Sequence, residues 1–264
     1  MNILDEIVKY KKKEVASAQL LIPECELRQM KYFDRNTLPL TEYIKAKDKT
    51  GIIAEFKRKS PSKGMINGSA RIEEVTKGYS QSGASALSVL TDYNFFGGSV
   101  DDLMKAREVN QIPVLRKEFI IDEYQVYEAK AVGADAVLLI AAILTPEETK
   151  KLAKKANELN LQVLLELYDD EELKRINDFV HVVGVNNRNL KTFEVNLQHS
   201  VQLAKKIPSG FTKISESGIS TPQDILFLRE HGFEGFLIGE NFMKTPCPEK
   251  AFHDFVESLA IKKV

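Results

Sequence analysis

The chain has 264 residues, of which 43% are hydrophobic and 28% are charged. This length and composition are typical of a globular protein with a large core, organised as one domain or two. The 37 basic and 38 acidic side chains leave a net charge of -1. So small a charge excludes the overall attraction on which nucleic-acid and anionic-membrane binding depend. We therefore expect any anion to be bound by a local cluster.

The spacing of cysteine and histidine predicts neither a metal site nor a disulfide. Cys25 and Cys247 are far apart in the sequence, and the four histidines are scattered singly. Two cysteines without an expected disulfide partner favour a reducing compartment. The first 18 residues are charged throughout and resemble no signal peptide, and the longest apolar run, 136–144, is too short to span a bilayer. We expect a cytoplasmic protein that does not bind membranes.

The N-terminal segment has an apolar stripe at helical spacing, made by Ile3, Leu4, Ile7 and Val8. The lysine-rich run 9–13 follows, and we expect it to lie on a solvated helix face. We interpret residues 1–48 as a helical extension packed on a barrel formed by residues 49–264, with the whole chain as a single domain.

From residue 51 onward, short apolar runs alternate with amphipathic stretches. The runs are rich in Val, Ile and Leu, as strands buried on both faces are. They lie at 51–56, 86–90, 113–116, 136–140, 162–166, 181–185, 212–215 and 235–238. Helical patterns between them include 72–82, 122–132, 146–159 and 222–231. Eight such units with short linkers predict an α/β protein with a single (β/α)8 TIM barrel.

The ends of the predicted helices carry matching signals. Thr145 and Thr221 each precede a proline, which puts a hydroxyl at the N-cap and proline at the first helical position. Gly83, Gly133 and Gly232 follow helices directly, as left-handed C-terminal caps do. No G-x-G-x-x-G sequence follows a strand, which argues against an open dinucleotide-binding sheet.

The first strand ends in two opposite charges. Side chains alternate along a strand, so Glu55 and Lys57 project from one side of an otherwise apolar run. Taken alone, they are explained equally well by a buried ion pair without a catalytic role. Further polar residues follow the ends of later strands, namely Lys117, Glu166, Asn186, Arg188 and Glu216. Because TIM-barrel active sites lie at these carboxyl ends, the set favours an active site.

Glycine-containing turns follow the last two predicted strands, at Ser217-Gly218 and at Gly239-Glu240-Asn241. In TIM barrels these loops, with the N-terminus of a short helix, frequently bind phosphate. Glycine permits close approach of backbone N–H groups to the anion. Turn geometry alone explains one such glycine, so the phosphate prediction depends on both turns together.

Six short segments carry a resemblance to a known enzyme family. They lie at 55–62 (EFKRKSPS), 88–92 (SVLTD), 96–99 (FGGS), 115–119 (LRKEF), 185–188 (VNNR) and 214–219 (ISESGI). They resemble indole-3-glycerol-phosphate synthase of tryptophan biosynthesis, over essentially the whole chain and without a second, fused barrel. The resemblance implies a lyase that closes the ring of 1-(2-carboxyphenylamino)-1-deoxyribulose 5-phosphate, giving indole-3-glycerol phosphate, carbon dioxide and water. It implies no cofactor and no metal.

The resemblance also implies catalytic roles. Lys117 would be the general acid that protonates the substrate carbonyl, and Glu166 would act in the dehydration. Lys57 would either hold anionic groups or protonate the departing hydroxyl. Glu55 and Glu216 would orient the lysines, so that the cluster titrates as a coupled set.

The substrate contacts implied by the resemblance form three groups. Polar and carboxylate contacts would come from Ser60, Asn186 and Arg188. The aromatic ring would lie against Phe96, Phe119 and Leu138, although core packing explains these positions as well. Phosphate would be bound by Ser217, Gly218, Gly239 and Glu240. After the glycine that corresponds to Gly239, the family usually reads Glu-Ser-Leu-Met, whereas residues 240–243 read Glu-Asn-Phe-Met. Binding of phosphate by the main chain would tolerate this change.

Two other functions stay open. A barrel like phosphoribosylanthranilate isomerase would need a Cys/Asp or paired-Asp arrangement at strand ends, and neither cysteine lies at one. A non-catalytic barrel that binds phosphorylated metabolites would need the phosphate turns but not Lys117 and Glu166 together. The leading hypothesis predicts a phosphorylated small-molecule substrate, with other tryptophan-pathway enzymes as possible partners.

Overall fold

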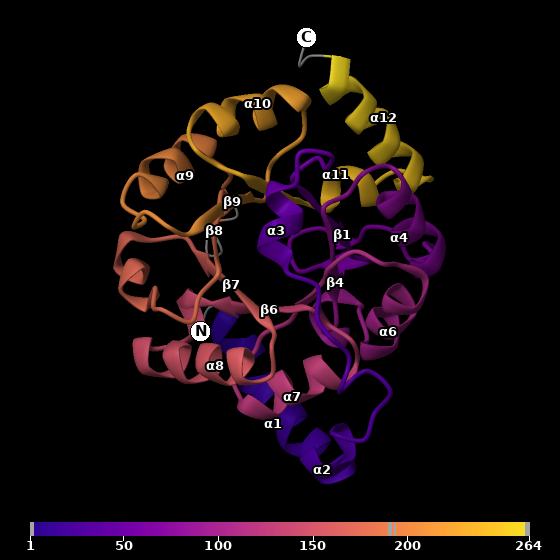
Figure 1. Cartoon of the computed structure of the whole chain (residues 1–264), viewed down its shortest axis with the longest axis vertical. Helices are drawn as coiled ribbons and strands as arrows, with labels where there is room; N and C mark the ends of the chain where they lie inside the picture. The colour runs from indigo at the N-terminus through magenta and orange to yellow at the C-terminus, as the bar shows by residue number, and fades with distance from the viewer. Residues whose placement is uncertain (1–2, 190–191, 193, 262–264) are drawn as a thin grey trace.

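The structure, a computed structural model, describes residues 3–189, 192 and 194–261. Within them eight parallel strands form a closed barrel (Figure 1), so the predicted TIM barrel is confirmed. The strands are β1 (Ile52–Phe56), β4 (Ala86–Leu90), β5 (Val114–Lys117), β6 (Ala136–Ile140), β7 (Gln162–Leu167), β8 (Val182–Asn186), β9 (Thr212–Glu216) and β10 (Gly235–Ile238). Strands pair in chain order, and β10 closes onto β1.

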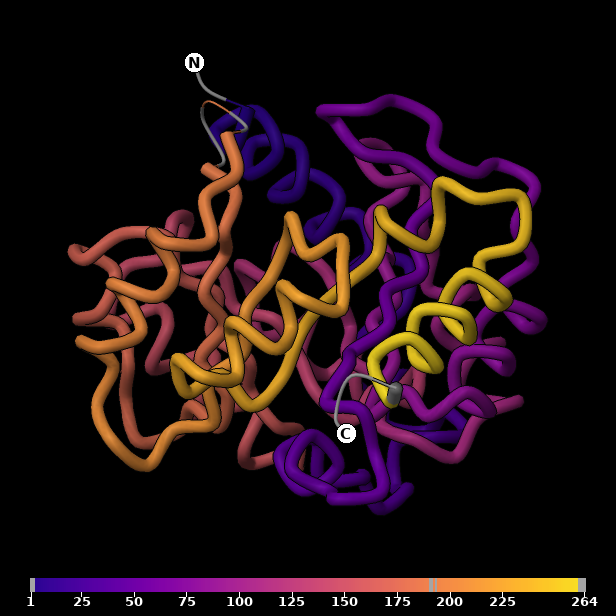
Figure 2. Tube along the Cα trace, turned by 90° about the horizontal axis from the view of Figure 1, so that it is seen from above, coloured from indigo at the N-terminus to yellow at the C-terminus, as the bar shows by residue number. Residues whose placement is uncertain are grey.

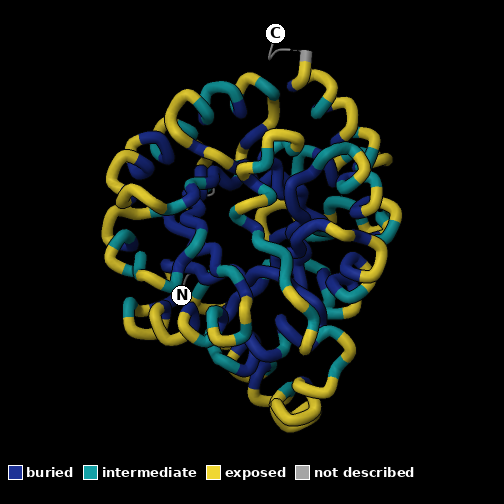
Figure 3. Tube along the Cα trace, in the orientation of Figure 1, coloured by how far each residue is buried: buried dark blue, intermediate teal, exposed yellow. Residues whose placement is uncertain are grey.

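Alternate residues of each strand fill the barrel interior, among them Ile53, Ala86, Leu115, Ala136, Leu164 and Ile214. The residues between them pack outward against the helices, among them Ile52, Leu87, Val114, Val137, Val163 and Val183. Both sets are buried, and the strands appear dark blue at the centre of Figure 3. Burial on both faces explains why the strands are continuous apolar runs in the sequence.

Helices cover the barrel from outside. The longer ones are α4 (Ile72–Gln81), α6 (Val100–Val109), α7 (Glu123–Ala131), α8 (Pro146–Glu158), α9 (Leu197–Ala204), α10 (Pro222–Glu230) and α12 (Pro248–Ile261). Shorter helical segments are α5 (Tyr93–Phe96), η1 (Ala141–Ile143), η2 (Asp170–Arg175) and α11 (Glu240–Met243). Across the described part of the chain, no helix combines the length and the apolar character needed to cross a membrane.

The predicted helix caps are confirmed. Thr145 and Thr221 each accept the backbone N–H three residues further on, and each precedes a proline at the start of its helix. Gly83, Gly133 and Gly232 have φ values of 92°, 93° and 83°. These glycines reverse the chain just after α4, α7 and α10, so that it can enter the next strand.

The N-terminal extension forms three helices where the sequence predicted one, namely α1 (Ile3–Leu21), α2 (Glu24–Leu27) and α3 (Leu40–Lys45). Figure 2 shows α1 beside the loops at one end of the barrel and α3 at the opposite end. Ile7 of α1 and Leu40 and Ile44 of α3 belong to the interior core. The extension therefore completes the barrel core at both ends.

The expectation that the lysine run 9–13 lies on a solvated face is wrong for one residue. Lys11 is 1% exposed, and its Nζ lies 2.9 Å from Asp92 Oδ2 and 3.0 Å from Glu118 Oε1. Its neighbours Lys12 and Lys13 are exposed, as expected. Residues four apart share one helix face, so Lys11 follows Ile7 onto the barrel.

Candidate active site

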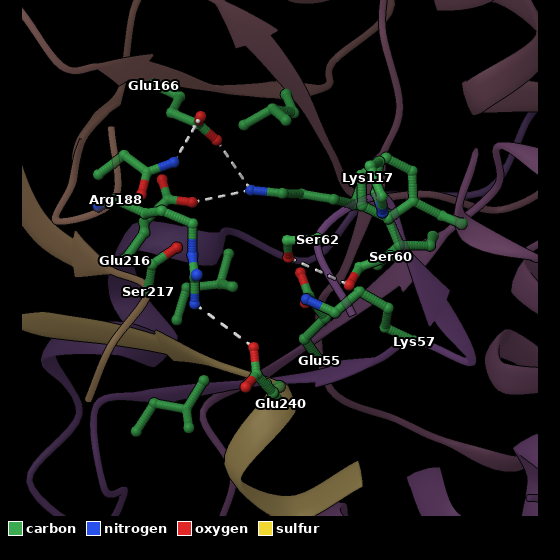
Figure 4. A pocket seen from close by; sticks show the side chains of 18 of the residues that line it. Glu55, Lys57, Ser60, Ser62, Lys117, Glu166, Arg188, Glu216, Ser217 and Glu240 are labelled. Atoms are coloured by element: carbon green, nitrogen blue, oxygen red, sulfur yellow. Dashed lines mark hydrogen bonds and ion pairs between the residues drawn. The ribbon is translucent and has the colours of Figure 1, made fainter. Parts of the chain in front are cut away.

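A cavity of about 250 Å³ opens at the carboxyl ends of the strands. All the residues with a predicted site role line it, namely Glu55, Lys57, Ser60, Phe96, Lys117, Phe119, Leu138, Glu166, Asn186, Arg188, Glu216, Ser217, Gly218, Gly239 and Glu240. In Figure 4 the side chain of Lys117 extends across the cavity toward Glu166 and Glu216. Segments far apart in the sequence thus bring acidic and basic groups within reach of one small molecule.

Lys117 is held between two carboxylates. Its Nζ donates to Glu166 Oε2 at 3.0 Å and to Glu216 Oε2 at 2.8 Å. Burial lowers the pKa of Lys117, but the negative charges of Glu166 and Glu216 outweigh this effect and hold the pKa above the ordinary lysine value. Lys117 therefore carries its proton throughout the neutral range. Two carboxylates facing a single ammonium group thus outweigh the effect of burial on its pKa.

The two carboxylates beside this ammonium group differ in how they titrate. Burial raises the pKa of Glu216 to about 7, because Lys117 offsets only part of the cost of burying its charge and Glu166 adds a second negative charge. For Glu166, burial acts in the same direction, but Lys117 and a hydrogen bond donated by Asn186 Nδ2 at 2.9 Å lower its pKa below the ordinary value. One carboxylate is thus a stable anion, while its neighbour exchanges a proton near neutral pH.

The second lysine of the cavity forms an ion pair within its own strand end. Lys57 Nζ lies 2.6 Å from Glu55 Oε1, and the Glu55 side chain is 4% exposed. The same-face placement expected from strand alternation is confirmed by this contact. Both residues line the cavity, so a substrate bound there would meet this ion pair.

Two glycines make room for the buried carboxylates. A Cβ atom on Gly184 of β8 would lie 2.0 Å from Glu216 Oε1, and one on Gly239 after β10 would lie 2.5 Å from Glu55 Oε1. Real Cβ atoms do not approach other atoms so closely. Any larger residue at these two positions would displace a carboxylate from the cavity.

Apolar side chains form one wall of the cavity. The rings of Phe96 and Phe119 lie with their centroids 5.8 Å apart, and Leu138 lines the cavity beside them although it is only 1% exposed. Three residues of α1 also line it, namely Ile3, Leu4 and Ile7. Sequence reasoning assigned these three only to helix packing, and nothing in their apolar stripe distinguishes cavity lining from packing on the barrel.

Arg188 and the turns after β9 and β10 form the opposite wall. Arg188 Nη2 lies 3.4 Å from Glu240 Oε2. Ser217 and Gly218 have φ values of 67° and 69°, a left-handed conformation that is strained for serine and that is found mainly where function requires it. The sequence missed Ser220 and Lys244, which line the cavity together with the predicted turn residue Asn241.

The departure from the family sequence at 240–243 has a structural account. Asn241 Nδ2 donates to the carbonyl of Ser220 at 3.0 Å, which ties the two turns together. Phe242 is 1% exposed and packs edge-on against Phe252 and Phe255. Asn241 lines the cavity and Phe242 does not, so of these two departures only Asn241 can meet a bound anion.

A two-stranded hairpin that the sequence did not predict borders the cavity. It consists of β2 (Lys59–Ser60) and β3 (Gly64–Met65). Ser60 is buried against the cavity, and its Oγ lies 3.5 Å from Ser62 Oγ. At the base of the hairpin, Arg58 makes a bidentate pair with Asp102 at 2.6 and 3.0 Å. This anchor fixes where the hairpin leaves the barrel.

No group of three or more His, Cys, Asp or Glu side chains that could hold a metal ion occurs among the described residues. Lys57, Lys117 and Arg188 each lie beside a carboxylate of the cavity. Their arrangement suits proton transfer and anion binding by side chains.

Comparison with known proteins identifies relatives over nearly the whole chain. The family model described as Indole-3-glycerol phosphate synthase matches residues 4–255. A protein of that name from Bacteroides thetaiotaomicron is 48% identical over 261 residues, which cover 98% of this chain and 99% of the relative. Another from Bordetella pertussis is 42% identical over 251 residues, covering 94% of this chain and 96% of the relative.

Solved structures agree on the fold. Tryptophan synthase subunit alpha from Legionella pneumophila str. Paris matches with a TM-score of 0.61 at 16% identity, over 85% of this chain and 97% of that chain. Identity this low shows a shared barrel and nothing about activity. The family match and the curated relatives, in contrast, extend through every strand end that lines the cavity, and the chain belongs to the indole-3-glycerol phosphate synthase family.

Proposed function

We propose that this cavity converts 1-(2-carboxyphenylamino)-1-deoxyribulose 5-phosphate to indole-3-glycerol phosphate, with residues of this chain in the roles given below. The observation that carries the proposal is the Lys117 ammonium group held between Glu166 and Glu216. The reaction needs a proton donor beside a carbonyl oxygen, a proton acceptor, a surface for an aromatic ring and a cation for anionic groups. Residues of each kind line the cavity.

Ring closure begins with attack of the carboxylate-bearing ring carbon on the ketone carbon. Lys117 donates a proton to the ketone oxygen as its bond order falls, so that no free alkoxide develops. The carboxylate then leaves as carbon dioxide, and the electron pair of the broken bond restores the aromatic ring. Because this electron pair returns to the substrate, the step needs no electron sink from a cofactor.

Dehydration follows on the newly closed five-membered ring. The hydroxyl group formed in the first step leaves as water once it has been protonated, and Glu166 accepts the proton that the ring loses. The lowered pKa of Glu166 keeps it ionised and able to accept that proton. Lys57 either protonates the departing hydroxyl or holds an anionic group, and Glu55 orients it through the 2.6 Å contact.

Substrate binding divides between the two walls of the cavity. We assign the aromatic ring to the wall formed by Phe96, Phe119 and Leu138. Polar and carboxylate contacts are assigned to Ser60, Asn186 and Arg188. Phosphate is assigned to the backbone of the two turns, at Ser217, Gly218, Gly239 and Glu240, since these residues line the cavity beside Arg188.

The proposal extends to the setting in which the enzyme works. We infer a single domain, with 1–48 and 49–264 sharing one core, because Ile7, Leu40 and Ile44 pack with the barrel interior. We further infer a cytoplasmic enzyme that acts on a phosphorylated small molecule. An isomerase of the phosphoribosylanthranilate type gains no support, since Cys25 and Cys247 are exposed and distant from strand ends.

An indole-fluorescence assay tests the proposal directly. The chain contains no tryptophan, so emission from the product indole rises without protein background. Purified protein with the carboxyphenylamino substrate is expected to give one indole per substrate consumed, together with one carbon dioxide. Phosphoribosylanthranilate serves as the control substrate and is expected to remain unchanged. Turnover of the control substrate alone would contradict the assignment.

A further inference from the structure

We infer that Lys11, on the N-terminal helix, is a positioning residue for the aromatic wall of the active site. The inference rests on the proposed function, since it takes Phe96 and Phe119 as the surface for the substrate ring. Lys11 contacts neither ring. It acts by joining two buried carboxylates, Asp92 and Glu118, each of which holds the backbone of one of these two phenylalanines.

The central contact is a buried ammonium group between two buried anions. Lys11 Nζ lies 2.9 Å from Asp92 Oδ2 and 3.0 Å from Glu118 Oε1, and the three side chains are 1%, 0% and 2% exposed. Burial lowers the pKa of Lys11, but Glu118 and Asp92 outweigh it and raise the pKa above its ordinary value. The group is therefore a permanent cation. A third contact, to Glu14 Oε1 at 3.0 Å, stays within α1.

Asp92 connects this cation to Phe96. Its Oδ1 accepts the backbone N–H groups of Phe95 at 2.7 Å and Phe96 at 3.3 Å, which makes it the N-cap of the short helix α5. The other carboxylate oxygen faces Lys11. A helix of one turn depends heavily on its cap, so the place of Phe96 depends on how Asp92 is held.

Glu118 connects the same cation to Phe119. Its Oε1, the atom that faces Lys11, also accepts the backbone N–H of Phe119 at 2.8 Å. Its Oε2 accepts a hydrogen bond from Thr91 Oγ1 at 2.7 Å. Thr91 directly precedes Asp92 in the chain, so the two carboxylates are linked a second time through the end of β4.

Without the cation, the two carboxylates would repel each other across a buried space. Asp92 and Glu118 would then move apart or take up a proton, and either change alters the backbone at both phenylalanines. The ring centroids of Phe96 and Phe119 lie 5.8 Å apart, and a shift of about 1 Å in positioning residues is enough to weaken catalysis strongly.

Attachment of α1 to the barrel does not itself require the ion pairs. Ile7 and Val15 already bury apolar surface on the same face of the helix, and an apolar side chain at position 11 would dock the helix with less desolvation. The charge at this position therefore fits a role in positioning better than a role in attachment. The same helix also lines the cavity directly, with Ile3, Leu4 and Ile7.

The test compares Lys11→Met with Lys12→Met, a matched change at the exposed neighbouring position. Wild-type turnover establishes the proposed function first and does so independently of Lys11. We expect Lys11→Met to raise KM for the substrate by roughly tenfold or more, with a smaller loss in kcat. Inhibition by inorganic phosphate, which does not contact the aromatic wall, is expected to change less than about twofold. Lys12→Met is expected to match the wild type in all three measurements.

Two results would overturn the inference while leaving the proposed function intact. One is a KM for Lys11→Met within about twofold of the wild type. The other is an equal loss of substrate and phosphate binding, which indicates general loosening of the site. Should Lys11→Met fail to fold, Asp92→Asn replaces it, because the amide oxygen can still cap α5 while the attraction to Lys11 is lost. The same selective rise in KM is expected for Asp92→Asn, and an unchanged KM again overturns the inference.

Discussion

Lys117 Nζ and Glu216 Oε2 lie 2.8 Å apart although their strands, β5 and β9, stand on opposite sides of the barrel. Three strands separate them in either direction around the closed sheet. Their side chains therefore meet near the barrel axis, at the end where the cavity opens. A small molecule in this cavity reaches both groups, which is the condition for proton transfer between them and a substrate.

Lys117→Arg separates charge from proton donation. The guanidinium group keeps a cation between Glu166 and Glu216 but does not give up its proton in proteins. We expect kcat to fall by about 10²-fold or more, with little change in the thermal unfolding midpoint. Indole fluorescence measures turnover, and circular dichroism measures unfolding. Activity close to that of the wild type would remove Lys117 from the acid step.

Glu216→Gln tests the titration near neutral pH. The raised pKa of Glu216, about 7 against an ordinary 4.5, means that the folded protein binds a proton more tightly than the unfolded chain. The stability that this proton contributes is present below pH 4.5 and is lost as the pH rises toward 7. In that window the free energy of unfolding of the wild type is expected to fall by up to about 1.4 kcal/mol per pH unit relative to Glu216→Gln.

Urea unfolding followed by circular dichroism at a series of pH values measures this difference. Glu147→Gln, at an exposed position, is the control and is expected to follow the wild type at every pH. Equal slopes for the wild type and Glu216→Gln between pH 4.5 and 7 would show that Glu216 has an ordinary pKa.

Gly239→Ala and Gly184→Ala test whether the carboxylates need the space that these glycines leave. The added methyl groups would lie 2.5 Å from Glu55 Oε1 and 2.0 Å from Glu216 Oε1. We expect each variant to lose activity by about 10²-fold, since small displacements of catalytic groups have effects of this size. Gly68→Ala is the control, because its methyl group meets only the flexible side chain of Met65, at 3.2 Å. Retention of full activity by both test variants would mean that the carboxylates can move without loss.

Glu240→Gln and Arg188→Ala are expected to change KM in opposite directions. The Glu240 carboxylate lies 3.4 Å from Arg188 Nη2 and so competes with an anionic substrate for it. Removing that charge is expected to lower KM by about two- to fivefold, the range of a half-exposed ion pair. Removing the guanidinium group is expected to raise KM by about tenfold or more. Steady-state kinetics at constant ionic strength measures both, and a raised KM for Glu240→Gln would show that its side chain binds substrate directly.

Much of the barrel could be predicted from the sequence because its signals are local. Strands buried on both faces are continuous apolar runs, and caps such as Thr145, Thr221 and Gly133 mark helix ends within a few residues. The carboxyl end of each strand is known once the strand is known, so Lys117 and Glu166 could be assigned to one site. The family membership predicted from the motifs is confirmed by the comparisons.

What the sequence could not predict depends on contacts between distant segments. Lys11 stands in a run of lysines, and only its partners Asp92 and Glu118, which follow β4 and β5, distinguish it from its exposed neighbours. The pKa of Glu216 likewise depends on Lys117 and Glu166, which lie on other strands. The β2–β3 hairpin was missed because each of its strands is only two residues long, too short for any periodic pattern.

The placement of Lys11 also has a consequence for the order in which the protein is made. Helix α1 leaves the ribosome before Asp92 and Glu118, whose carboxylates neutralise Lys11. Until then the nascent helix presents a basic, partly apolar surface with no place to dock. Docking of α1 through these ion pairs therefore has to wait until the first three barrel strands, β1, β4 and β5, have been made.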